Sequence, residues 1–287
     1  MIINQLPFHT HRTLTLLLLA LLQAACSGVP SNRGGYYQDD GPHNNPRVDI
    51  STIPDAVPRN DPLSASGNKP YNVFGKMYYP LKDASGYDER GIASWYGKKF
   101  HGKKTSSGEA YDMYTMTAAH KTLPLPCYVR VRNLNNGRSV IVRVNDRGPF
   151  LENRLIDLSY AAASRLGIVG SGTGIVEVVG INADAPASNN MTAQTPASPS
   201  TPASPDNTAQ PRLYLQVGAF TSRDNAENLR RQLERAEFKP VQVQVASQDQ
   251  TTLYRVRIGP LSSVDASDNL AQRVAGYGIH NAFVTVE

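Results

Sequence analysis

Residues 183–211 divide the sequence into two parts, because they are rich in Ala, Ser, Thr and Pro. Their only long apolar side chain is Met191, so they cannot bury enough surface to offset the entropy of an ordered chain. We therefore expect a disordered linker with a separately folded domain on each side. A chain of 287 residues is long enough for two domains of ordinary size.

Composition excludes two broad classes of protein. The 29 Lys and Arg residues exceed the 24 Asp and Glu residues by 5, and charged residues are 18% of the chain without a polybasic tract. We therefore expect no nucleic-acid binding, which depends on clustered positive charge. The two cysteines, Cys26 and Cys127, are too few for a disulfide framework or a four-ligand zinc site.

The N-terminus has the pattern of a secretory signal peptide over residues 1–25. Arg12 precedes an apolar run over residues 13–22, which is too short to span a bilayer and is followed by small residues and Cys26. This junction resembles a bacterial lipobox, which implies that Cys26 is lipidated and, with Ser rather than Asp next, anchored in the outer membrane. Ordinary cleavage beside an incidental cysteine is the alternative, because Gln23 stands where the lipobox usually has Leu.

The composition changes again between this junction and the linker. Residues 26–70 contain scattered prolines and few apolar residues, which predicts a disordered tether. Residues 71–182 contain short β-rich runs separated by glycines, with 12 Lys or Arg against six Asp or Glu between positions 91 and 182. This pattern predicts a basic, mainly β domain with an N-terminal extension.

Residues 212–287 form a second predicted domain with an internal repeat. The run YLQVGAF from Tyr214 is answered by YRVRIGP from Tyr254, and each run is an alternating strand that ends at a glycine. Ser and Thr residues suited to helix capping follow both runs. The predicted order is βαββαβ, with helices over 223–236 and 264–275 and further strands over 241–245 and 282–286.

Both helices of such a domain pack on one face of the sheet, so the other face is open. Alternation puts Tyr214, Gln216, Arg255 and Arg257 on that open face. The repeat resembles the SPOR family, whose members bind peptidoglycan glycan strands that lack stem peptides. The resemblance implies that Gln216, Ala219 and Arg255 line a glycan site, with Arg257 beside them.

Five motifs in the central region resemble the double-psi β-barrel of the rare lipoprotein A family. In sequence order they are GIASWYG from Gly91, TSSGE from Thr105, TAAH from Thr117, VIVRVNDRGP from Val140 and IDLS from Ile156, and the short run VRV from Val129 also fits. The order of lipobox, barrel and SPOR domain is also that of the family. We therefore expect a mainly β plus α+β protein, with a six-stranded double-psi β-barrel over 71–182 joined by the linker to the βαββαβ domain.

Alternation also places a candidate catalytic acid. Val140, Val142 and Val144 share one parity and should face the core, and Asp146 continues that parity at the strand end. Burial at such a rim would favour the protonated carboxyl that acid catalysis needs, whereas Arg147 would favour the carboxylate. Bracing of the following turn is the alternative role for Asp146.

The family resemblance implies further site residues. It places Glu109 and His120 with Asp146 in the catalytic groove. Other candidates for contact with the sugar are Trp95, Tyr96, Arg147 and Asp157. Core packing is the alternative for the two aromatic residues. For Asp157 the alternative is capping of the helix that follows Ser159 or bracing of a turn.

The resemblance implies a lytic transglycosylase. It would cleave the bond between N-acetylmuramic acid and N-acetylglucosamine in septal glycan that lacks stem peptides, with Asp146 as acid and then base. The muramoyl 6-hydroxyl would be the nucleophile, so 1,6-anhydro ends would form without any metal or cofactor. Alternatives are an expansin-like module that loosens glycan without cleavage and a septal scaffold. Expected partners are glycan strands, the outer membrane through Cys26, and septal or amidase proteins on the periplasmic side of the envelope.

Overall fold

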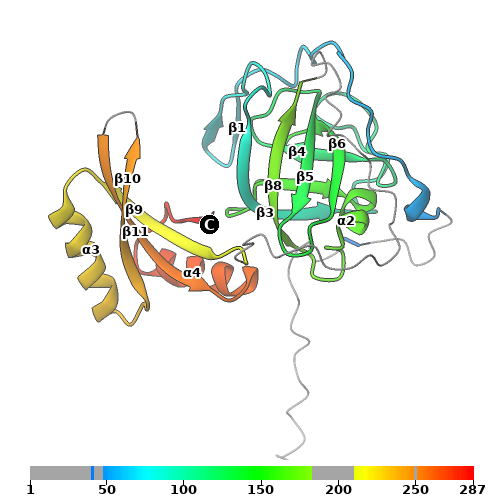
Figure 1. Ribbon diagram of the computed structural model, residues 1–287. Helices are drawn as coiled ribbons and strands as arrows, with labels where there is room; N and C mark the ends of the chain where they lie inside the picture. The colour runs from blue at the N-terminus through cyan, green and yellow to red at the C-terminus, as the bar shows by residue number, and fades with distance from the viewer. Residues whose placement is uncertain (1–39, 42–47, 183–209, 249–250) are drawn as a thin grey trace, which may run out of the picture. The chain divides into compact units, whose positions relative to one another are not determined.

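The computed structural model describes residues 40–41, 48–182, 210–248 and 251–287 (Figure 1). The predicted signal peptide, the lipidation site at Cys26 and most of the predicted linker lie outside these residues. Of the helices in the described ranges, none is both long enough and apolar enough to cross a membrane.

Six strands close into a barrel in the order β3-β7-β4-β6-β5-β8. Their bounds are β3 Asp88–Tyr96, β4 Thr117–His120, β5 Cys127–Asn133, β6 Ser139–Asp146, β7 Ile156–Ser159 and β8 Gly174–Ile181. The pairs β3–β7 and β4–β6 are parallel, and the other neighbouring pairs are antiparallel. Alternating apolar side chains fill the interior, and the inward valines of β6 are at most 1% exposed. The predicted six-stranded barrel is confirmed.

A short helix, α2 (Tyr160–Leu166), follows β7 and packs on the barrel core. Ser159 caps it, because its hydroxyl accepts the N–H of Ala162. The three alanines at its start are fully buried, since only small side chains let a helix approach the barrel this closely.

Residues 48–70 differ from the predicted disordered tether. They include a 3-10 turn, η1 (Ile50–Thr52), and run along the barrel wall before a hairpin of β1 (Tyr71–Val73) and β2 (Lys76–Tyr78) (Figure 1). The amide of Ala56 donates to Ile141 at 3.1 Å, and the amide of Ser64 donates to Leu125 at 2.7 Å. Composition missed this segment because a few anchors, well separated in sequence, hold it.

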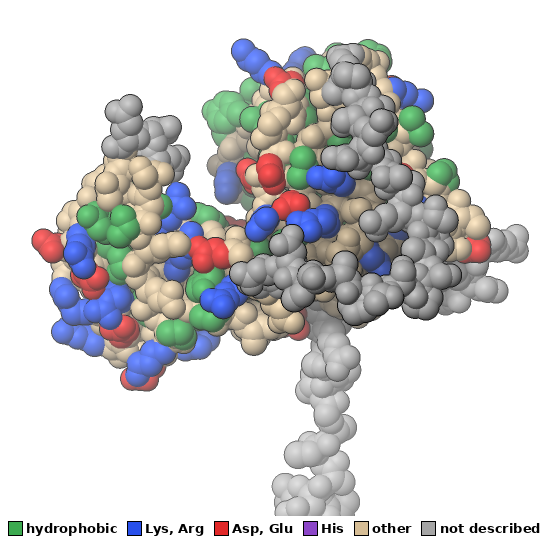
Figure 2. Space-filling view, viewed as in Figure 1, with side chains coloured by type: hydrophobic (Ala, Val, Ile, Leu, Met, Phe, Trp, Pro, Cys, Tyr) green, Lys and Arg blue, Asp and Glu red, His purple; other side chains and the backbone are tan. Residues whose placement is uncertain are grey.

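The C-terminal domain has the predicted βαββαβ order. Its elements are β9 Leu213–Phe220, α3 Arg223–Arg235, β10 Val241–Gln248, β11 Thr251–Leu261, α4 Val264–Gly276 and β12 Phe283–Val286. The sheet order is β10-β11-β9-β12, and both helices pack on the face that carries Leu215 and Ile258. Ser222 and Ser263 cap the helices through their hydroxyl groups. Acidic and basic side chains are interspersed over α3 (Figure 2), where Arg230 pairs with Glu227 and Glu234.

Candidate active site

A β-bulge at Asn145 decides where Asp146 points. On β4 the partners of Val144 and Asp146 are the consecutive residues Ala118 and Ala119, so Asn145 is an extra residue in β6. Ala118 belongs to the barrel core, whereas Ala119 packs in a separate cluster on the outer face. Asp146 therefore lies on the outer face, and the prediction that it continues the parity of the inward valines is wrong.

The outer face carries a row of small and acidic residues across four neighbouring strands. Ser94 on β3 pairs with Asp157 on β7, Asp157 pairs with Ala119 on β4, and Ala119 pairs with Asp146 on β6. We call these four residues the carboxylate row. The two carboxyl groups start from strands two positions apart, about 9–10 Å between backbones, with the small side chain of Ala119 between them.

Gly148 is a buried residue beside the row. Its φ is +138°, which a residue with a side chain rarely adopts. A Cβ atom there would lie 3.9 Å from Ala119 Cβ, 3.9 Å from Phe150 Cε2 and 4.0 Å from Asp157 Oδ2. Gly148 therefore lies close to the Asp157 carboxyl group and to the edge of the Phe150 ring.

Asp146 is held by one loop and its own backbone. Its Oδ1 atom accepts hydrogen bonds from the Ser106 amide (2.8 Å), the Ser106 hydroxyl (2.7 Å) and the Arg147 amide (2.8 Å). Gly108, at a φ of +94°, closes the turn that carries Ser106, and Thr105 N–H donates to the carbonyl of Glu109 at 2.8 Å. All three donors converge on Oδ1, so Oδ2 takes no part in this network.

Asp157 is the carboxyl group with the altered acidity. Burial raises its pKa from 3.8 to about 6, against the lowering effects of a hydrogen bond from Ser94 and of the charges of Arg154 and Lys121; Asp146 adds to the rise. The capping role considered for Asp157 is wrong, because Ser159 caps α2. The structure instead brings Asp157 into the same row as Asp146.

Glu109 lies beside the row but is tied to β6. Arg143 Nη1 donates to both carboxylate oxygens at 2.7 and 2.6 Å, and Asn145 Nδ2 donates to Oε2 at 2.9 Å. Burial alone would raise the pKa of Glu109, but the hydrogen bonds from Arg143 and Asn145 outweigh it, so the pKa is lowered. Glu109 is therefore a carboxylate that fixes the loop holding Ser106.

His120 does not join the carboxylate row. It pairs with Ile156, a core residue, and is only 3% exposed. Its Nδ1 atom accepts the amides of Thr122 (3.1 Å) and Leu123 (2.9 Å), so the proton of the neutral ring is on Nε2, 2.9 Å from the Tyr87 hydroxyl. Burial lowers the pKa of His120 to about 3, and it braces the turn after β4 as a neutral ring rather than lining the groove as predicted.

Three residues predicted to contact the sugar are instead occupied in core packing or in hydrogen bonds to the backbone. Trp95 is 2% exposed in the barrel core, and Tyr96 is 6% exposed with its ring stacked on Tyr111 at 4.1 Å, so the core-packing alternative holds for both. Arg147 donates to the carbonyls of Gly67, His120 and Leu123. Its guanidinium thus clamps the N-terminal segment to the turn after β4.

Sequence reasoning missed the aromatic residues that do border the row. Tyr71 and Tyr78 of the β1–β2 hairpin stack at 5.2 Å, and the edge of Phe150 meets them at 6.1 and 5.9 Å. The run YNVFGKMYY over 71–79 is dense in aromatic residues around a Phe-Gly turn, and this was the available signal. We call Tyr71, Tyr78 and Phe150 the aromatic wall.

The C-terminal domain brings the predicted glycan residues together. Arg255 on β11 pairs with Ala219 on β9, and Arg257 pairs with Gln216. A bulge at Val217 between these pairs puts Ala219, rather than Gly218, on the open face. Arg257 already donates to the Glu287 carboxylate, which leaves Arg255 as the more available guanidinium.

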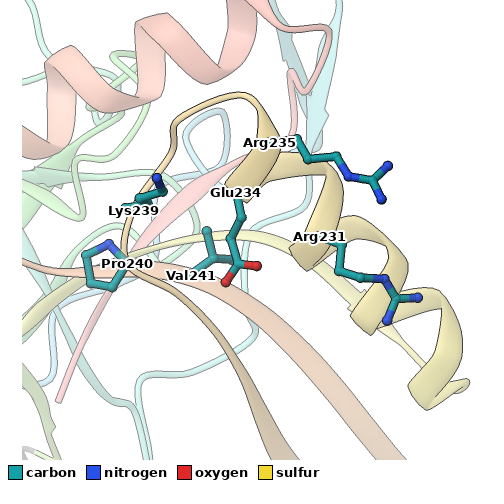
Figure 3. A pocket seen from close by; sticks show the side chains of 6 residues that line it. All are labelled: Arg231, Glu234, Arg235, Lys239, Pro240 and Val241. Atoms are coloured by element: carbon teal, nitrogen blue, oxygen red, sulfur yellow. The ribbon is translucent and has the colours of Figure 1, made fainter.

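Other regions offer less chemistry. A hollow at the end of α3 is lined by Arg231, Glu234, Arg235, Lys239, Pro240 and Val241 (Figure 3). Glu234 lies beside Val241 there, while the two arginines extend away from the hollow.

Within the described ranges, no group of three His, Cys, Asp or Glu side chains could hold a metal ion. Burial raises the pKa of Cys127 to about 12, so this thiol is not a nucleophile.

Comparison with known proteins identifies the family of both domains. The family described as lytic transglycolase matches residues 88–179, and the SPOR domain family matches residues 209–285. A Pseudomonas aeruginosa protein named endolytic peptidoglycan transglycosylase RlpA is 44% identical over 285 residues, which covers 85% of this chain and 82% of that protein. The chain belongs to the RlpA family. The RlpA of Vibrio cholerae is 41% identical over 93% of this chain and 94% of its own length, and that of Neisseria meningitidis serogroup A is 56% identical over 47% of this chain and 58% of its own.

Proposed function

We propose that this chain is an endolytic peptidoglycan transglycosylase in which Asp157 and Asp146 carry out different proton transfers. The relatives' names supply the reaction class, and the carboxylate row is the observation that supports the assignment of residues. Sequence reasoning gave both proton transfers to Asp146. The placement of Asp157 in the same row favours a division, with Asp157 as acid and Asp146 as base.

The first step is protonation of the leaving group. Asp157 has a pKa near 6, so a substantial fraction is protonated in mildly acidic conditions. Its proton passes to the oxygen that joins C1 of N-acetylmuramic acid to C4 of N-acetylglucosamine, and the C1–oxygen bond breaks. Positive charge that develops at C1 is stabilised by the Asp146 carboxylate on the other side of Ala119.

The second step closes the anhydro ring. The 6-hydroxyl of the same muramoyl residue attacks C1, and its proton passes to Asp146. The products are a 1,6-anhydromuramoyl end and a free 4-hydroxyl. Asp146 then loses its proton to solvent, and Asp157 takes a proton from solvent. An ordinary glycosidase uses its second carboxyl to activate water or attack C1, whereas here the substrate supplies the nucleophile.

Product analysis tests the function. Sacculi freed of stem peptides by an amidase are incubated with the wild-type chain, and anhydromuramoyl ends are counted by mass spectrometry. Asp157→Asn and Asp146→Asn should each lower their release by about 10²–10⁴-fold. The matched control is Asp88→Asn, an exposed carboxyl at the start of β3, which should leave the rate unchanged. Absence of anhydro ends from the wild-type reaction would instead favour glycan loosening without cleavage.

A second substrate separates the two roles. A muramoyl glycoside with a good aryl leaving group does not need protonation of that group. We expect this substrate to rescue Asp157→Asn but not Asp146→Asn. Rescue of Asp146→Asn alone would reverse the assignment. Rescue of neither variant would show that the two residues are not a separate acid and base.

Location follows from the parts at either end of the chain. We propose that lipidation at Cys26 holds the protein on the periplasmic side of the outer membrane, and that Arg255, Gln216 and Ala219 bind glycan without stem peptides. The SPOR match and the alignment of Arg255 with Ala219 support the second point. Cys26→Ser should release the protein from the membrane fraction, and Arg255→Ala should reduce enrichment at the division septum without unfolding the domain.

A further inference from the structure

Residues 61–68 contact β6 and the loop that holds Asp146, and we call them the N-terminal brace. They precede residues 88–179, the part of the chain that the lytic transglycolase family covers. The family match therefore says nothing of their role. Their composition alone predicted a disordered tether, so a contact with the catalytic loop was not expected from the sequence.

Asp61 of the brace binds two residues that face each other on neighbouring strands. Tyr128 on β5 lies opposite Arg143 on β6. Asp61 Oδ2 accepts hydrogen bonds from the Tyr128 hydroxyl at 2.8 Å and from Arg143 Nε at 2.9 Å. Burial alone would raise the pKa of Asp61, but the hydrogen bonds from Arg143 and Tyr128 outweigh it, so the pKa is lowered. Asp61 is therefore a carboxylate that fixes one edge of the Arg143 guanidinium.

The same guanidinium holds Glu109 through a different nitrogen atom. Arg143 donates to Glu109 from Nη1 and to Asp61 from Nε. Because the guanidinium is planar and rigid, a partner that fixes Nε also fixes the direction of Nη1. Glu109 in turn holds the loop whose Ser106 donates twice to Asp146. The position of Asp61 thus reaches Ser106 through two ion pairs.

Gly67 gives the brace a second contact with this loop. Gly67 is buried, and a Cβ atom there would lie 2.9 Å from the Ser106 carbonyl oxygen, so the two backbones pack directly together. The Gly67 carbonyl also accepts Nε (3.0 Å) and Nη2 (2.8 Å) of Arg147. Ser106 and Arg147 are the two residues whose amides donate to Asp146 Oδ1. The brace therefore supports both of them.

We propose that Asp61 and Gly67 are positioning residues for Asp146, which they influence through Ser106 and Arg147. This inference rests on the proposed function, because it assigns Asp146 a proton transfer whose rate depends on its position. The N-terminal brace is then part of the catalytic apparatus, although it lies ahead of the barrel strands in the sequence. Its loss slows the chemical step rather than weakening substrate binding.

Kinetics on glycan without stem peptides test the role of Asp61. Asp61→Ala should lower kcat about 10-fold with little change in KM, as a small displacement of a reacting group does. The matched control is Asp55→Ala, because Asp55 lies in the same N-terminal segment but pairs with Arg165, at 3.2 Å, and it should keep kcat. In a Glu109→Gln background, Asp61→Ala should cost little further activity, since both residues act through Arg143. An unchanged kcat in Asp61→Ala, or losses that add fully to those of Glu109→Gln, would overturn the proposal.

Hydrogen exchange tests the placement of Asp146 without any catalysis. The Ser106 amide exchanges when its hydrogen bond to Asp146 opens, so Asp61→Ala should speed this exchange about 10-fold, measured by NMR. Gly67→Ala should do the same because its Cβ displaces the Ser106 carbonyl, whereas Gly170→Ala places its Cβ with nothing within 4 Å and should not. Unchanged exchange in both Asp61→Ala and Gly67→Ala would refute the inference. If the wild-type chain forms no anhydro ends, the proposed function fails, yet faster exchange in these variants still shows that the brace positions Asp146.

Discussion

Asp157→Asn should make the barrel more stable while it removes activity. The carboxyl group of Asp157 is largely removed from solvent in the folded protein, which raises its pKa from 3.8 to about 6. A folded-state pKa above the unfolded value means that the folded state holds the proton more tightly. The contribution of Asp157 to stability is therefore greatest at low pH and is lost as pH rises from about 3.8 to 6.

The size of this effect follows from the shift. Relative to a fully protonated Asp157, this rise in pKa lowers the free energy of unfolding by about 3 kcal/mol at pH 7.5, where the carboxyl group is ionised in both the folded and the unfolded state. At pH 4 the reduction is about 0.5 kcal/mol. Asparagine has nearly the same shape, its Oδ1 can still accept the Ser94 hydroxyl, and it has no charge to desolvate. We therefore expect Asp157→Asn to raise the free energy of unfolding by up to about 3 kcal/mol at pH 7.5 and by much less at pH 4.

The single tryptophan makes the measurement specific to the barrel. Trp95 is the only Trp in the chain and is 2% exposed in the barrel core, so its fluorescence in urea reports unfolding of this domain alone. Asp88→Asn, an exposed change on the same strand, should alter stability by less than about 0.5 kcal/mol at both pH values. A variant Asp157→Asn that is no more stable than wild type at pH 7.5, or equally stabilised at pH 4, would refute a buried, proton-binding Asp157.

Three further results are expected from the same site and from the C-terminal sheet. Ser94→Ala removes a hydrogen bond that lowers the pKa of Asp157, so the alkaline limb of the pH–rate profile should move to higher pH, and a profile that stays in place would contradict that contact. Glu109→Gln removes one of the two carboxylate partners of Arg143, the other being Asp61, and should lower kcat about 10-fold or more with little loss of substrate binding, measured by initial rates on glycan without stem peptides. Arg255→Ala should weaken sedimentation with amidase-treated sacculi by about 10- to 100-fold while the circular dichroism spectrum is unchanged.

The C-terminal domain was predictable because its signals are local. Each predicted strand alternates, ends at a glycine and is followed by a serine that caps the next helix, as Ser222 and Ser263 do. These signals act within a few residues, so reading the sequence in short windows found the elements and the face on which both helices pack. On the opposite face, predicted to be open, Tyr214, Gln216 and Arg257 are at most 7% exposed. The one irregularity, the bulge at Val217, moved Ala219 to the face where resemblance had placed it.

The barrel site was less predictable because its geometry depends on partners far apart in sequence. Alternation correctly put Val140, Val142 and Val144 in the core, yet it put Asp146 on the wrong face, since the bulge at Asn145 is defined only against β4. Asp157 looked like a capping residue because Ser159 is close in sequence. Only the pairing with Ser94 and Ala119 reveals its place in the row.

The bulge at Asn145 also explains how one strand serves both packing and chemistry. A regular β6 would direct Asp146 into a core of fully buried valines, where a carboxyl group with no partner is costly. The extra residue, Asn145, turns Asp146 outward to Ser106. The side chain of Asn145 donates a hydrogen bond to Glu109 at 2.9 Å. Asp157 lies on a strand without a bulge, and its carboxyl group is held against Ser94, away from solvent. The same fold thus leaves one carboxyl group fixed in position by a network of donors, and the other desolvated, suited to give a proton.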